Sequence, residues 1–83
     1  MSLTDARSGD TVLVERVDLS SAAAIRLGEL GLMPGEELRV LRNQRPCPLV
    51  LGLGSAQLML GRDIGDSISV RSSPLRKGPR QRA

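Results

Sequence analysis

The chain alternates short apolar runs with turns rich in glycine, proline and serine. Five segments have the length and composition typical of β-strands: residues 11–17, 36–42, 49–53, 56–60 and 67–71. Within 36–42, Leu38 and Val40 alternate with charged residues and are expected to point inward. Gly54-Ser55 is typical of a type II′ hairpin link. The pattern predicts a mainly β fold, a small antiparallel barrel of about five strands.

One helix is expected between the first and second strands. Ala23, Leu27 and Leu30 recur at helical spacing and form an apolar stripe, so we expect both leucines in the core. Residues 18–21 offer an aspartate and two serines as N-caps. Gly28 lies inside this helix, where it lowers stability relative to alanine; we expect it to mark a close approach to another backbone, the alternative being a simple weak point of the helix.

A tight corner is predicted where this helix gives way to the second strand. Gly31 suits a helix end in the left-handed conformation, which glycine adopts without a Cβ clash. Pro34-Gly35 supplies the two central residues of a type II turn. Met33 follows the helix end and precedes the turn, so it is the apolar residue most expected to be exposed.

Composition limits the chemistry that 83 residues of one small domain can perform. The sequence has no His, Phe, Tyr or Trp, so it lacks the usual general base and the rings that stack on single-stranded bases. Residues 1–75 carry eight Arg against nine acidic residues, a net charge of −1, whereas residues 76–83 carry four basic residues. We therefore predict a domain at 1–71 and a basic, disordered tail at 72–83, either simply solvated or in weak electrostatic contact with an anionic membrane surface or nucleic acid.

No catalytic constellation is recognisable, so the sequence predicts a binding module rather than an enzyme, with no cofactor. Asp63 and Asp66 are weak peripheral candidates for an ion, and a solvated turn is the simpler interpretation. The single Cys47 has no partner for an internal disulfide, which favours a reducing compartment. With neither an export signal nor a long apolar run, a cytoplasmic location is expected.

The corner sequence RLGELGLMPG carries a family resemblance. Together with the strand ELRVL and the later LGxGSAQLMLGRDIGDSISV, it resembles the ferrous-iron transport protein A (FeoA) family over roughly residues 3–71. The matching positions of the corner motif are Arg26, Leu27, Leu30, Gly31, Leu32, Pro34 and Gly35. The resemblance implies an SH3-like barrel with an inserted helix. It also implies an accessory role in bacterial Fe(II) uptake, beside the membrane permease FeoB, whose cytoplasmic side carries a GTP-binding domain.

Two functional hypotheses follow. The first is an interaction module for the FeoB-type permease, with a contact surface formed by Arg26, Leu30, Leu32, Met33, Pro34 and Gly35. Leu27 and Gly31 would be structural. The second is a free-standing SH3-like regulatory domain, related to the C-terminal domain of iron-dependent repressors, or a nucleic-acid-binding barrel. The net charge of −1 over residues 1–75 and the absence of aromatic rings argue against nucleic acid as the partner. The sequence leaves the oligomeric state open.

Overall fold

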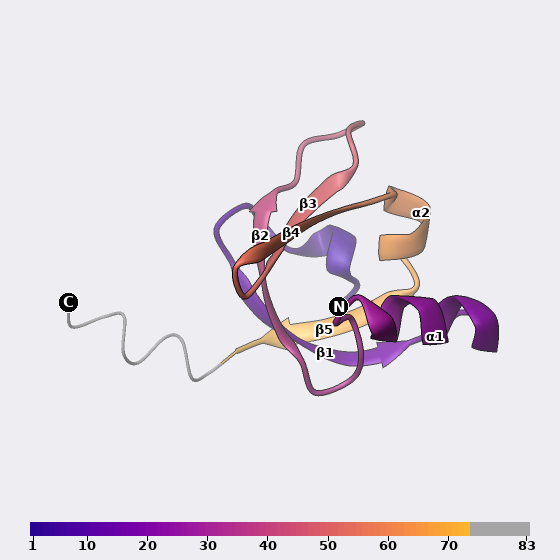
Figure 1. Ribbon diagram of the computed structural model, residues 1–83. Coiled ribbons are helices and arrows are strands. Elements are labelled where there is room, and N and C mark those ends of the chain that lie inside the picture. The colour runs from indigo at the N-terminus through magenta and orange to yellow at the C-terminus, as the bar shows by residue number, and fades with distance from the viewer. Residues whose placement is uncertain (74–83) are drawn as a thin grey trace.

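A computed structural model describes residues 1–73 as a small, strongly curved β-structure (Figure 1). Its elements are η1 (Leu3–Asp5), β1 (Thr11–Val17), α1 (Ser21–Glu29), β2 (Glu37–Arg42), β3 (Leu49–Leu53), β4 (Ala56–Leu60), α2 (Arg62–Gly65) and β5 (Ile68–Ser72). The five strands form one antiparallel sheet in the order β4-β3-β2-β1-β5. The predicted SH3-like barrel with one helix after the first strand is confirmed.

The interior of the barrel is filled by aliphatic side chains. Leu38 and Val40 of β2, predicted to point inward, are buried, as are Val12 and Val14 of β1 and the apolar residues of β5. The fully or nearly fully buried core consists of Leu3, Ala6, Val12, Val14, Leu27, Leu32, Leu38, Val40, Leu49, Leu51, Leu60, Ile68 and Val70. Because this core has no large aromatic residue, its stability depends on the fit of many small side chains.

The N-terminal residues form part of the barrel, which the sequence did not indicate. Leu3 is completely buried in η1. The backbone N–H of Val70 donates to the carbonyl of Met1 (2.8 Å), and Ser2 forms an isolated bridge with Ser69. The first residues of the chain therefore cover the outer edge of β5.

The folded domain extends slightly beyond the predicted boundary at residue 71. Strand β5 includes Ser72, and Ser73 is buried. The N–H of Ser73 donates to the carbonyl of Thr11 (3.1 Å), and its hydroxyl hydrogen-bonds to the carboxylate of Glu37. Most of the predicted basic tail, residues 74–83, lies outside the described residues. No helix within residues 1–73 is long and apolar enough to cross a membrane.

The loop between β2 and β3 is held by polar contacts. The side-chain amide of Asn43 donates to the carbonyls of Thr4 (3.1 Å) and Ala6 (2.5 Å). The guanidinium of Arg62 donates to the side-chain oxygen of Asn43 (2.7 Å) and to the carbonyl of Cys47 (2.9 Å). These bonds connect three segments that are distant in sequence, and the Cys47 thiol is exposed beside them.

Candidate partner-binding surface

Helix α1 ends in a Schellman motif, as the glycine at position 31 predicted. Gly31 has a φ of 100°. The N–H of Leu32 donates to the carbonyl of Leu27 (2.9 Å), and the N–H of Gly31 donates to that of Gly28 (3.0 Å). This pair of bonds satisfies carbonyls that the helix end would otherwise leave unpaired. Leu27 and Leu32 both join the core, so the helix end is anchored from beneath.

The turn that follows is fixed to the barrel. Gly35 has a φ of 94°, and the N–H of Glu36 donates to the carbonyl of Met33 (3.1 Å), as expected for the predicted type II turn around Pro34. Two further backbone bonds reach β1: the N–H of Gly35 donates to the carbonyl of Val14 (2.8 Å), and the N–H of Val14 donates to the carbonyl of Glu36 (2.9 Å). The corner is therefore a fixed platform rather than a loose loop.

Large aliphatic side chains remain exposed on this platform and on helix α1, which leads into it. Ile25 is 64% exposed, Leu30 is 51% exposed and Met33 is 44% exposed. We use the term corner surface for Ile25, Arg26, Leu30, Met33, Pro34 and Gly35. Ile25 was missed by the sequence interpretation, although its place outside the apolar stripe is the signal that could have identified it.

Two leucines of the motif lie where they were not expected. The prediction that Leu32 contributes to the contact surface is wrong, because its side chain is completely buried. The prediction that Leu30 joins the core is also wrong. After the reversal at Gly31, Leu32 occupies the core position against Leu27, and Leu30 is left on the outside. Both leucines were predicted to be contact residues, and of the two only Leu30 is exposed, so the corner surface keeps Leu30 and Met33 and loses Leu32.

Arg26 lies on the exposed side of α1 and makes no hydrogen bond or ion pair with any residue of the described chain, 1–73. Its neighbour Gly28 was expected to approach another backbone, and this expectation is wrong: a Cβ added there would meet no atom within 4 Å. The outer side of α1 is therefore open, and the guanidinium of Arg26 is available to an acidic partner.

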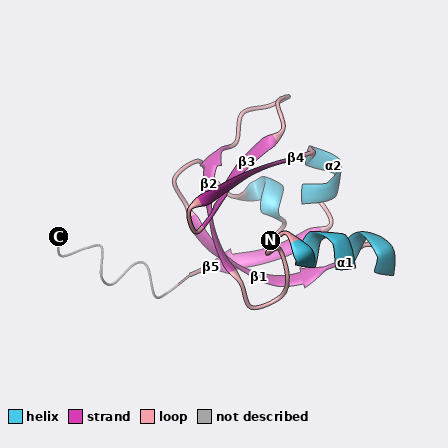
Figure 2. Ribbon diagram, in the orientation of Figure 1, coloured by secondary structure: helices cyan, strands magenta, loops and turns pink. Residues whose placement is uncertain are grey.

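A shallow apolar hollow of about 460 Å³ separates α1 from α2 and the end of β4. Aliphatic side chains form most of its wall, including Leu19, Leu27, Leu60 and Ile64, and Arg26 lines it as well. Figure 2 shows the two α-helices on the same side of the barrel. This hollow continues the exposed face of α1 and enlarges the area that a partner could contact.

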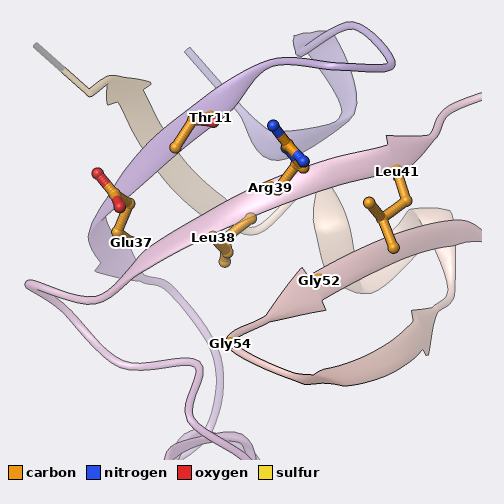
Figure 3. Close-up of a pocket in the computed structure, with 7 residues that line it drawn as sticks. All are labelled: Thr11, Glu37, Leu38, Arg39, Leu41, Gly52 and Gly54. Carbon is orange, nitrogen blue, oxygen red and sulfur yellow. The ribbon is translucent and has the colours of Figure 1, made fainter. Parts of the chain in front are cut away.

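A second hollow, of about 350 Å³, lies over β1, β2 and β3 (Figure 3). The side chain of Leu41 extends toward Gly52, and a Cβ added at Gly52 would lie 3.4 Å from it. Glu37 and Arg39 give the wall both signs of charge. Nothing in this mixed lining singles out a class of ligand.

The two aspartates considered for an ion are exposed and lie at α2. Asp63 lies in the first turn of α2. Asp66 accepts a hydrogen bond from the hydroxyl of Thr4 (2.6 Å), which joins the end of α2 to η1. Residues 1–73 contain no group of three or more His, Cys, Asp or Glu side chains arranged to hold a metal ion. The carboxylate of Asp66 therefore makes a structural contact between α2 and η1.

Comparison with known proteins identifies the family. The FeoA domain model matches residues 1–72. The chain belongs to the FeoA family. It is 30% identical over 71 residues to a protein of Methanocaldococcus jannaschii named "Putative Fe(2+) transport protein A", covering 86% of this chain and 85% of that protein. The family is associated with ferrous-iron transport.

Solved FeoA structures share this fold. A crystal structure named iron uptake regulatory protein (FeoA) superposes with a TM-score of 0.81 and 23% identity, covering 88% of this chain and 97% of that one. The FeoA protein of Chlorobium tepidum superposes with a TM-score of 0.78 and 31% identity, covering 87% of this chain and 70% of that one. The agreement extends to almost all of the described residues.

Metal-dependent repressors contain a similar domain. A manganese-dependent transcriptional repressor superposes with a TM-score of 0.75 and 27% identity, and the match covers 88% of this chain but only 41% of the repressor. The FeoA-like fold therefore also occurs as one part of longer regulatory proteins.

Proposed function

We propose that this FeoA-family chain is a non-catalytic accessory protein of bacterial ferrous-iron uptake. It acts in the cytoplasm by binding the cytoplasmic part of a FeoB-type permease. The observation that supports a binding role most directly is the corner surface, where Leu30 and Met33 are exposed at a corner held by backbone bonds to β1 and Ile25 is exposed on the preceding helix α1. A site formed before binding loses little conformational entropy when the partner docks.

The chemistry of the corner surface indicates what the permease must offer. The exposed aliphatic side chains require an apolar patch on the permease, because burying apolar surface is the main favourable term in association. Arg26 adds a cation that has no partner within residues 1–73, so an acidic side chain beside that patch would pair with it. The proposed partner region is therefore an apolar patch bordered by a carboxylate.

The decisive experiment measures binding of the full chain to the detergent-solubilised FeoB-type permease of the same organism. Replacing Met33 by Asp puts a charge into the proposed contact. We expect this to weaken binding by about 2 kcal/mol, or roughly 30-fold, as at other interface hot spots. Leu30→Asp should have a similar effect, since Leu30 is equally part of the surface.

Met59→Asp is the matched control, because Met59 is an exposed methionine (67%) on β4 rather than on the corner. It should bind the permease like the unchanged chain. If folded Met33→Asp and Leu30→Asp both retain full affinity, the corner surface is excluded as the contact. If the unchanged chain does not bind at all, the permease is excluded as the partner.

The similarity to a metal-dependent repressor supports a second candidate function, a regulatory domain that binds nucleic acid. This alternative requires binding by the folded body, whose residues 1–75 have a net charge of −1. Nucleic-acid binding should then survive removal of residues 74–83 and weaken steeply with salt. If nucleic-acid binding is lost when the basic residues are removed, the binding is nonspecific electrostatic attraction and the alternative is rejected.

A further inference from the structure

The two edge strands of the sheet, β5 and β4, differ in whether another segment covers them. Strand β5 is covered by the N-terminal residues, which bond to Ser69 and Val70. Strand β4 pairs with β3 on one side and, within residues 1–73, with nothing on the other. An uncovered edge presents a row of backbone donors and acceptors to any extended chain that can align with it.

The register of the β3–β4 hairpin identifies the open groups. Leu53 pairs with Ala56 across a two-residue turn, which makes this a hydrogen-bonded pair. Because such pairs alternate along an antiparallel ladder, Leu58 is in the next hydrogen-bonded pair, and Gln57 and Met59 are in non-hydrogen-bonded pairs. The N–H and C=O groups of Gln57 and Met59 therefore point away from β3, and neither residue makes a backbone hydrogen bond to another segment of residues 1–73.

Strand β4 also lacks the features that protect natural edges. Its sequence AQLML contains no charge and no proline, and no bulge interrupts its pairing with β3. Met59 is 67% exposed, the most exposed of the large hydrophobic residues described. An edge of this composition is suited to pairing with another uncharged strand.

We propose that two copies of this chain associate by antiparallel pairing of β4 with β4. With the two-fold axis at Leu58, Gln57 of each copy lies opposite Met59 of the other. All outward groups of these two residues then find partners, because each donor faces an acceptor of the second copy. The two sheets become one continuous sheet.

The partner that best fits this edge is a second copy of the chain, because β4 is complementary to itself. The two-fold arrangement brings no like charges together, since β4 has none. It places each exposed Met59 side chain beside a Gln57 side chain on the same face of the joined sheet. An acidic or basic strand from another protein would find no complementary charge on β4. The inference goes beyond the proposed function and does not depend on it.

Hydrogen exchange of the full chain, followed by NMR at increasing protein concentration, tests the pairing directly. The amides of Gln57 and Met59 should exchange rapidly in dilute solution and become protected as the concentration rises, in step with a monomer–dimer shift in sedimentation. The Leu58 amide, which faces β3, should be protected throughout. Rapid exchange of Gln57 and Met59 at every concentration would overturn the proposal.

Two substitutions at one position separate backbone pairing from side-chain contact. Met59→Pro removes an N–H that β3 does not use, and edge strands accept proline where the N–H faces solvent. Met59→Ala removes the side chain but keeps that N–H. We expect the alanine variant to retain concentration-dependent dimerisation and the proline variant to remain monomeric.

Protection of the Leu58 amide verifies that the proline variant is folded, and dimerisation of the folded variant would contradict β4 pairing. Should that variant not fold, the exchange profile of the unchanged chain decides by itself. Met33→Asp, which is designed to weaken permease binding, should leave dimerisation unchanged, so the two proposals fail independently.

Discussion

Helices α1 and α2 differ in length and in how they are attached to the barrel. Helix α1 has nine residues, yet Leu27 is its one buried residue. Helix α2 has four residues, and Gly65 is buried against Leu49 and Thr4. The difference arises from what each helix connects: α2 joins β4 to β5 over the core, whereas α1 is inserted between strands that already pair with each other.

This difference between the two helices affects function as well as packing. The side chain of Arg62 in α2 holds the β2–β3 loop through Asn43 and Cys47. In contrast, Arg26 of α1 is left without a partner in residues 1–73, and Ile25 is left exposed. A helix that is anchored at one end and open along its outer side can bind a partner without disturbing the core.

The largest effect should come from removing the single anchor of α1. Leu27→Ala deletes a buried side chain that packs in the core beside Leu32, so we expect a loss of about 2–5 kcal/mol in the free energy of unfolding. Urea denaturation measures this value. Ile25→Ala, on the same helix but 64% exposed, is the control and should change stability little. Equal losses in the two variants would contradict the description of α1 as held by one residue.

A smaller loss is expected from adding one methyl group to α2. A Cβ at Gly65 would lie 2.7 Å from Cδ1 of Leu49 and 3.0 Å from Cγ2 of Thr4, both in buried residues. Because these neighbours have little room to move, Gly65→Ala should destabilise the protein by about 1–3 kcal/mol in urea denaturation. Unchanged or increased stability would show that α2 is not closely packed.

The same substitution in α1 should have the opposite sign and the smallest size. A Cβ at Gly28 meets no atom within 4 Å, and alanine is a better helix former than glycine. We therefore expect Gly28→Ala to stabilise the protein by about 0.5–1 kcal/mol, measured as a higher thermal midpoint. A lower midpoint would mean that α1 needs glycine at this position for a reason absent from its contacts.

Much of the local backbone could be predicted from the residues themselves. The strands, the helix, the stop at Gly31 and the turns at Pro34-Gly35 and Gly54-Ser55 all lie within a residue or two of their expected positions. The roles of Leu30, Leu32 and Gly28 could not be predicted, because periodicity shows which residues share a helix face but not what covers that face. Arg62 carried no signal at all, since its partners come from a distant loop.

The sequence alone determined where the chain turns, because a glycine at positive φ or a proline with fixed φ sets the backbone whatever surrounds it. Only the tertiary structure decided which side chains are covered, which edge the N-terminus protects and which edge stays open. Those outcomes depend on segments far apart in the sequence meeting in the folded barrel, and no local pattern of hydrophobic and polar residues contains that information.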